Sequence, residues 1–150
     1  MRPKIHLIIG IIFVVFLKIF FPNITWISLS IILFSSVLID GDHYFYYILR
    51  TKNFSLIKCY AWYKKHLEET LALPMSGRKK RYTGFYVLHG IEPLIVLFLL
   101  GISVSQFFMF IFIGFLLHFI FDIPSEMIIK GTVHKISLIY SYTQFRKLEK

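Results

Sequence analysis

The residues best suited to chemistry in this sequence are its three aspartates and the histidines near them. Residues three or four positions apart share one face of a helix, so each set below is able to point at a common centre. Imidazole nitrogens and carboxylate oxygens together suit divalent metals such as Zn²⁺, Mn²⁺ or Fe²⁺. The sets are the run Asp40-Gly41-Asp42-His43, the pair His89 and Glu92, and the pair His118 and Asp122.

Four apolar segments must position these residues. The 150-residue chain is 57% hydrophobic with a mean hydropathy of +0.68, which is more apolar side chain than a soluble domain of this size buries. A membrane-spanning helix needs about 20 residues, with roughly 17 as the lower end. We therefore expect one all-α, polytopic membrane domain over residues 1–150, with four transmembrane helices. The predicted spans are 5–22, 24–40, 85–101 and 105–122.

The distribution of basic residues predicts the orientation of these spans. Nine of the 17 Lys and Arg residues lie between Arg50 and Arg81, and five more follow Asp122. The connections around Pro22 and Ser103 are short and uncharged. The positive-inside rule therefore places the N-terminus, the central connection and the C-terminus in the cytoplasm. This topology brings all of the candidate residues to the cytoplasmic face of the membrane.

Two further segments are expected at the membrane surface. Residues 53–73 repeat apolar positions at helical spacing opposite charged ones, which predicts an interfacial amphipathic helix on the cytoplasmic side. Residues 132–147 are too short an apolar stretch to span, and they are predicted to form an interfacial tail. The basic run 78–81 is expected to contact anionic lipid rather than nucleic acid. The single cysteine, Cys59, excludes a disulfide framework and is expected to fill space in a half-buried helix.

The common depth of the acids and histidines favours a functional reading over a structural one. Ionisable side chains at membrane depth cost roughly 2.5–3.5 kcal/mol each on insertion scales, and they persist where they pair or bind an ion. Taken alone, Asp40 and Asp42 would mark a turn at the end of a span, and His118 would be an interior histidine with a hydrogen bond. Together they favour a metal site. Three histidines lie outside these sets and are interpreted as surface or interfacial residues: His6, His66 and His134.

The motifs resemble those of the YdjM-like membrane-bound metal-dependent hydrolases, a family of small polytopic membrane proteins. The resemblance rests on the 40–43 run, an isolated His89 and the His118-x-x-x-Asp122 element, and it covers residues from about 24 to 125. Ile39 stands where the family has a proline before D-x-D, and Leu88-His89-Gly90 stands where it has T-H-S. The resemblance implies metal binding by Asp40, Asp42, His43, His89, His118 and Asp122.

The expected function is that of a membrane-embedded metal-dependent hydrolase acting at the cytoplasmic face. One or two ions (Zn, Mn or Fe) would activate water for phosphoester hydrolysis, with Glu92, or alternatively Glu126, as general base. A lipid or lipid-linked phosphoester is the expected substrate, because such molecules share that depth. The alternative is a non-catalytic metal-binding membrane protein or an assembly partner. Membrane lipids are the expected partners, no nucleic acid is expected, and the oligomeric state is left open.

Overall fold

The computed structural model describes residues 3–81, 84–133 and 135–148, and within these ranges every regular element is an α-helix. The all-α prediction is therefore confirmed for the described residues. In chain order the helices are α1 (Pro3–Phe20), α2 (Trp26–Leu38), α3 (Gly41–Thr51), α4 (Leu56–Ala72), α5 (Met75–Lys80), α6 (Ile91–Ser103), α7 (Gln106–Lys130) and α8 (Leu138–Leu148).

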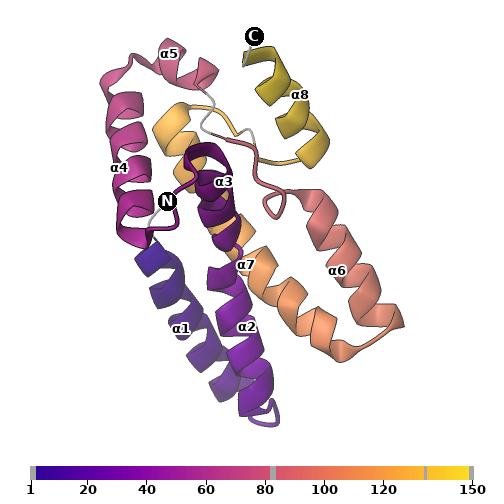
Figure 1. Cartoon of the computed structure of the whole chain (residues 1–150). Helices are drawn as coiled ribbons and strands as arrows, with labels where there is room; N and C mark the ends of the chain where they lie inside the picture. The colour runs from indigo at the N-terminus through magenta and orange to yellow at the C-terminus, as the bar shows by residue number, and fades with distance from the viewer. Residues whose placement is uncertain (1–2, 82–83, 134, 149–150) are drawn as a thin grey trace.

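Four apolar helices, α1, α2, α6 and α7, make the body of the fold. In Figure 1 the α1–α2 and α6–α7 turns lie at the lower end, and α3, α4, α5 and α8 gather at the upper end. Helix α2 packs on α1 and on α7, and α7 also packs on α6. Val14, Leu29 and Ile32 are buried together in a core between α1 and α2, and Phe110 and Ile113 of α7 pack against it. The three helices are thereby fixed relative to one another.

Side-chain hydroxyls cap the start of three helices. Thr25, Ser55 and Ser105 each accept a bond from a backbone amide in the first turn, at 3.2 to 3.3 Å. These bonds satisfy amides that a helix start otherwise leaves unpaired. At its other end α7 stops at Gly131, whose φ of 68° lies in the left-handed region where a side chain is strained.

All four predicted spans differ from the helices in their bounds, and α1 is shifted by two residues at each end. After a two-residue turn, the second continues as α3 from Gly41 to Thr51. The third begins at Ile91, so residues 85–90 precede the helix. The fourth runs on to Lys130, past its predicted end at 122. Pro124 inside it removes one helical hydrogen bond without ending the helix.

Two helical segments are long and apolar enough to cross a bilayer, by length and composition. They are Trp26–Thr51, with a mean hydropathy of 1.2, and Gln106–Lys130, with 2.1. Helix α6 is apolar but shorter. The predicted amphipathic segment forms α4, and Glu69 of α4 pairs with Arg81 just after α5. The hydrogen bond from that guanidinium holds the pKa of the Glu69 carboxyl below its usual range.

Candidate metal centre

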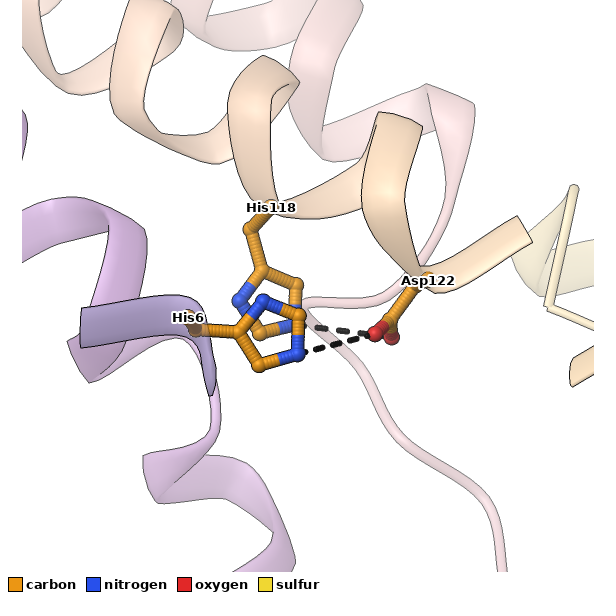
Figure 2. A group of neighbouring side chains, drawn as sticks. All are labelled: His6, His118 and Asp122. Atoms are coloured by element: carbon orange, nitrogen blue, oxygen red, sulfur yellow. Dashed lines mark ion pairs between the residues drawn. The ribbon is translucent and has the colours of Figure 1, made fainter. Parts of the chain in front are cut away.

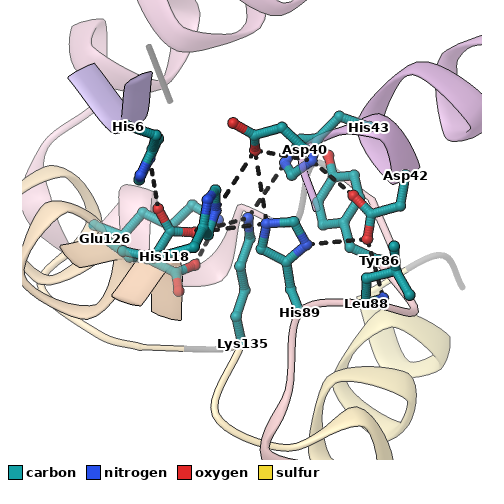
Figure 3. Close-up of polar contacts among 12 residues, drawn as sticks. His6, Asp40, Asp42, His43, Tyr86, Leu88, His89, His118, Glu126 and Lys135 are labelled. Atoms are coloured by element: carbon teal, nitrogen blue, oxygen red, sulfur yellow. Dashed lines mark hydrogen bonds and ion pairs between the residues drawn. The ribbon is translucent and has the colours of Figure 1, made fainter. Parts of the chain in front are cut away.

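The six predicted ligand residues lie together where the α2–α3 turn meets α7 and the segment before α6. Figure 3 shows five of them, with their labels, around a common centre. The turn and the start of α3 supply three, the segment 84–90 supplies one and α7 supplies two. They are Asp40, Asp42, His43, His89, His118 and Asp122.

Short-range backbone bonds shape the turn that carries Asp40. The Asp40 amide bonds the Val37 carbonyl at 3.2 Å, and the His43 amide bonds the Asp40 carbonyl at 3.1 Å. These bonds span three residues, which is tighter than the α-helical spacing. Ile39 and Asp40 therefore separate α2 from α3 in a tighter turn without a residue of positive φ. The Asp40 carboxylate lies 3.6 to 3.7 Å from ring nitrogens of His43, His89 and His118.

Asp42 holds the segment before α6 in place. Its Oδ2 accepts a bond from the Leu88 amide at 3.1 Å and lies 3.0 Å from His89 Nδ1. Its Oδ1 lies 2.9 Å from His43 Nδ1. Both oxygens of Asp42 are therefore engaged in orienting neighbours. This arrangement fixes the His89 ring with Nε2 toward Asp40 and Asp122.

His118 is oriented by α2. Its Nδ1 lies 2.8 Å from the Ser36 carbonyl, which accepts a proton from that nitrogen. A proton on Nδ1 leaves Nε2, which lies 3.4 Å from Asp122 Oδ2, as the ring nitrogen with the lone pair in a neutral imidazole. His89, with Nδ1 on a carboxylate, presents Nε2 in the same way. In metal proteins a ligating histidine usually donates its other ring N–H to a carboxylate or a backbone carbonyl.

The atoms that face the centre are buried and lack hydrogen-bond partners. Among the described residues these atoms are both carboxylate oxygens of Asp40 and Asp122, and Nε2 of His89 and His118. The histidine nitrogens lie 3.4 to 3.7 Å from the nearest oxygens of the two aspartates. Ligands held tetrahedrally at about 2.1 Å from one ion lie about 3.4 Å from each other. Buried acceptors aimed at one another are unfavourable unless a proton or a metal ion lies between them. The mixed nitrogen and oxygen donor set fits a bound metal ion.

His6 also belongs to this cluster, and its reading as a surface or interfacial residue is wrong. His6 is 7% exposed, and its ring stacks on His118 with the ring centroids 3.9 Å apart. Its Nε2 lies 3.2 Å from Asp122 Oδ1, as Figure 2 shows. His6, His118 and Asp122 form one group with metal-ligand spacing, and Asp40, His43 and His89 form another. Its position in the first turn of the first predicted span, at the depth of the other ligands, was the signal that could have found it.

A basic side chain borders the centre. Lys135 Nζ lies 3.3 Å from His43 Nε2 and 4.0 Å from Asp122 Oδ2. It also lies 4.6 Å from the ring centroid of Tyr86, which stacks on His43. In the sequence, Lys135 serves only as one of the basic residues that predict the orientation of the spans in the membrane, because it belongs to no motif. It brings one positive charge to the edge of a group of carboxylates.

Glu92 does not share a helical face with His89, and that expectation is wrong because His89 precedes α6. The Glu92 carboxylate accepts bonds from the Ser137 hydroxyl at 2.6 Å and the Leu138 amide at 2.8 Å, at the start of α8. Glu126 accepts a bond from Lys130 at 3.2 Å. A general-base role for either glutamate stays a prediction. His66 bonds the Trp62 carbonyl within α4, and His134 lies outside the described residues.

The comparisons with known proteins add no relative. No family model matches the chain, and no curated protein or solved structure matches it. The resemblance to the YdjM-like hydrolases therefore rests on the motif residues alone.

Proposed function

We propose that this chain is a membrane-embedded, metal-dependent hydrolase that acts on a lipid phosphoester at the cytoplasmic face. One observation carries the proposal. Four residues from three separate segments, Asp40, His89, His118 and Asp122, turn buried acceptor atoms without hydrogen-bond partners toward one centre. Ionisable groups persist at membrane depth where they bind an ion or line a polar site.

These four residues would hold the ion, and His6 would add a fifth ligand, its Nε2 nitrogen, beside Asp122. Mixed nitrogen and carboxylate ligands suit Zn²⁺, Mn²⁺ or Fe²⁺. Such an ion, when bound, lowers the pKa of water and polarises a phosphoryl oxygen. The two ligand groups adjoin through His89 and Asp122, 3.6 Å apart, so the site has room for one ion or a bridged pair.

Exposed apolar side chains support a four-span arrangement. Ile12 of α1, Ile27 of α2 and Ile102 of α6 are 62 to 75% exposed, and Phe107 of α7 is 49% exposed. Such a surface on four neighbouring helices is costly in water and favourable in lipid. The proposed spans are α1, α2, α6 and α7. The basic segments near α4, α5 and α8 then face the cytoplasm under the positive-inside rule.

Lys135 supports a phosphate-bearing substrate. Its ammonium group lies beside His43 and the proposed ligand Asp122, where it is able to bind a phosphoryl oxygen. A substrate that reaches this centre from the bilayer must share its depth, which a lipid headgroup does. We therefore assign binding of the substrate phosphate to Lys135 and orientation of His89 to Asp42.

A second candidate function is metal binding without catalysis. The contacts of the glutamates favour it, because Glu92 holds the start of α8 and Glu126 bonds Lys130. Neither carboxylate is among the buried atoms that lack a hydrogen-bond partner. A non-catalytic protein would bind metal with the same ligands and cleave no phosphoester.

Metal analysis of the detergent-purified chain tests the proposal. We expect at least one equivalent of transition metal in the native protein, and loss of most of it in Asp122→Asn and His118→Gln, which keep the side-chain shapes. His66→Gln removes a histidine that lies outside the centre, and it should retain its metal. A native protein without metal, or metal that survives both ligand substitutions, would overturn the metal site. Metal without cleavage across a panel of lipid phosphoesters would favour the second candidate.

A further inference from the structure

An apolar groove of about 620 Å³ runs along the outside of the bundle between α2 and α7. One face of α2 forms its first wall, with Trp26, Phe34 and Leu38 among the lining residues. Phe107 and Phe115 of α7 belong to the opposite wall. Its volume lies within the range of roughly 300–1,000 Å³ that is typical of small-molecule sites.

The groove is apolar along most of its length. Its polar lining is confined to the hydroxyls of Ser30 and Ser35 and the indole of Trp26. Ser35 donates its hydroxyl proton to the Ile32 carbonyl at 3.0 Å, so it offers little to a polar ligand. A lining of this kind fits a hydrocarbon rather than a sugar or a nucleotide.

The inner end of the groove leads to the metal centre. Leu88 is one of the lining residues, and its amide donates to Asp42 Oδ2 at 3.1 Å. The next residue along the chain is His89, whose Nε2 faces Asp40 and Asp122. A molecule lying in the groove therefore has one end within a residue of the proposed ligands.

The groove follows the length of α2. Trp26 and Leu38 lie twelve residues apart on this helix, which corresponds to about 18 Å along its axis. Leu38 lies at the end of α2 that is next to Asp40, and Trp26 lies at the other end. A single extended hydrocarbon chain would therefore lie along the groove with one end beside the metal centre.

From this continuity we infer that the groove binds one hydrocarbon chain of the phosphate-bearing lipid on which the centre acts. The inference rests on the proposed function and adds to it a binding site for the substrate tail. The tail lies against Phe34 and Phe115 and the headgroup lies at Lys135. Burial of the chain positions the phosphoester relative to the ligands, so chain length influences cleavage.

Photo-crosslinking in vesicles tests the inference. The full chain is reconstituted in phosphatidylcholine with a small fraction of phosphatidic acid that carries a diazirine in one acyl chain. We expect severalfold more label on Phe34 and Phe115 than on Ile12, an equally lipid-facing residue of α1. Ser30→Trp should fill the groove and reduce that label severalfold, whereas Ile12→Trp should leave it unchanged.

Two results would overturn the groove assignment. One is equal labelling of α1 and the groove, or label that is unaffected by Ser30→Trp. The other is equal groove labelling by a diazirine diacylglycerol, which has the same chains and no phosphate. Metal content, measured on the same samples, reports on the proposed function separately. Phosphate-dependent groove labelling in a protein that binds no metal would support the groove and contradict the hydrolase.

Discussion

At the scale of single residues, the centre depends on bonds made away from it. The Ser36 carbonyl is hydrogen-bonded to Nδ1 of His118, and the Asp42 carboxylate is hydrogen-bonded to Nδ1 of His89. Each ring therefore points its Nε2 toward the centre. Hydrogen bonds of this kind fix the tautomer and strengthen the ligand. Asp42 thus acts through His89, although the sequence motif suggested that it binds metal directly. Its role as a ligand stays a prediction.

His6→Gln is predicted to weaken metal binding without unfolding the protein. The substitution removes a ring that stacks on His118 and contacts Asp122, and it leaves the four central residues in place. Loss of an outer ligand or of an orienting partner typically lowers metal affinity by about 10–100-fold. Titration of the stripped protein with Zn²⁺ in detergent, with His66→Gln as the control, measures the change. Equal affinity in His6→Gln and the native protein would exclude His6 from the site.

Sequence patterns predicted the six clustered residues but not their distinct roles. Spacing of three or four positions brought His118 and Asp122 to one face of α7, as the i, i+4 rule requires. It failed for His89 and Glu92, because the rule applies only within a helix. His6 was missed because it has no acidic neighbour in the sequence. Lys135 lies in the connection between α7 and α8, where no helical periodicity in the sequence predicts the position of a side chain.

At the scale of the helices, close contact between α2 and α7 sets the position of His118. Gly114 lies one turn before His118, against Ser35 and the Ile32 carbonyl of α2. Small residues at such contacts let helix backbones approach closely. The same closeness brings the Ser36 carbonyl within bonding distance of His118.

Gly114→Ala is predicted to destabilise the fold by about 1–3 kcal/mol, the usual cost of overpacking. The new Cβ would lie 2.5 Å from the Ile32 carbonyl oxygen, which is backbone and cannot rotate away. Gly41→Ala is the matched control, because a Cβ there meets nothing within 4 Å. Thermal unfolding in detergent should show a lower Tm for Gly114→Ala alone. A Tm equal to that of the Gly41 variant would contradict this packing.

The start of α6 is a feature that local sequence patterns did not predict correctly. Residues 85–90 are mostly apolar and were assigned to a span, yet α6 begins only at Ile91. Pro93 fits the first turn of a helix, whereas a helix starting at 85 would place it in the interior, where it clashes with the preceding turn. That proline was the available signal. The hydrogen bonds that Leu88 and His89 make to Asp42 join residues far apart in the sequence, so no local sequence pattern predicts them.

At the scale of the whole molecule, the proposed topology separates two ends of different chemistry. The α1–α2 turn and the basic helix α5 lie at opposite ends of the molecule (Figure 1). The metal centre lies at the α2–α3 turn, at the end of α2 opposite the turn that contains Asn23. In a bilayer these ends would face opposite aqueous compartments. Cysteine labelling distinguishes them, because the native thiol is shielded. Cys59 is 8% exposed, and burial raises the pKa of its thiol.

In a Cys59→Ala background, Asn23→Cys is predicted to react with a membrane-impermeant maleimide in intact cells. Lys80→Cys should react only after permeabilisation. Both native side chains are exposed, so each introduced thiol is accessible to water on its own side. The extent of labelling on gels is the measurement. Labelling of both positions from one side would contradict the four-span arrangement, and the reverse pattern would invert its orientation.

The proposed ligands are far apart in the sequence, so they are synthesised at different times. During synthesis His6 and Asp40 come before His118 and Asp122, which lie on α7. In the proposed arrangement the Asp40 carboxylate would lack these partners until α7 inserts, at a cost in the membrane. The proposed ion would therefore be acquired only after the last apolar helix is in place. It would then link α1, through His6, to α7, through His118 and Asp122.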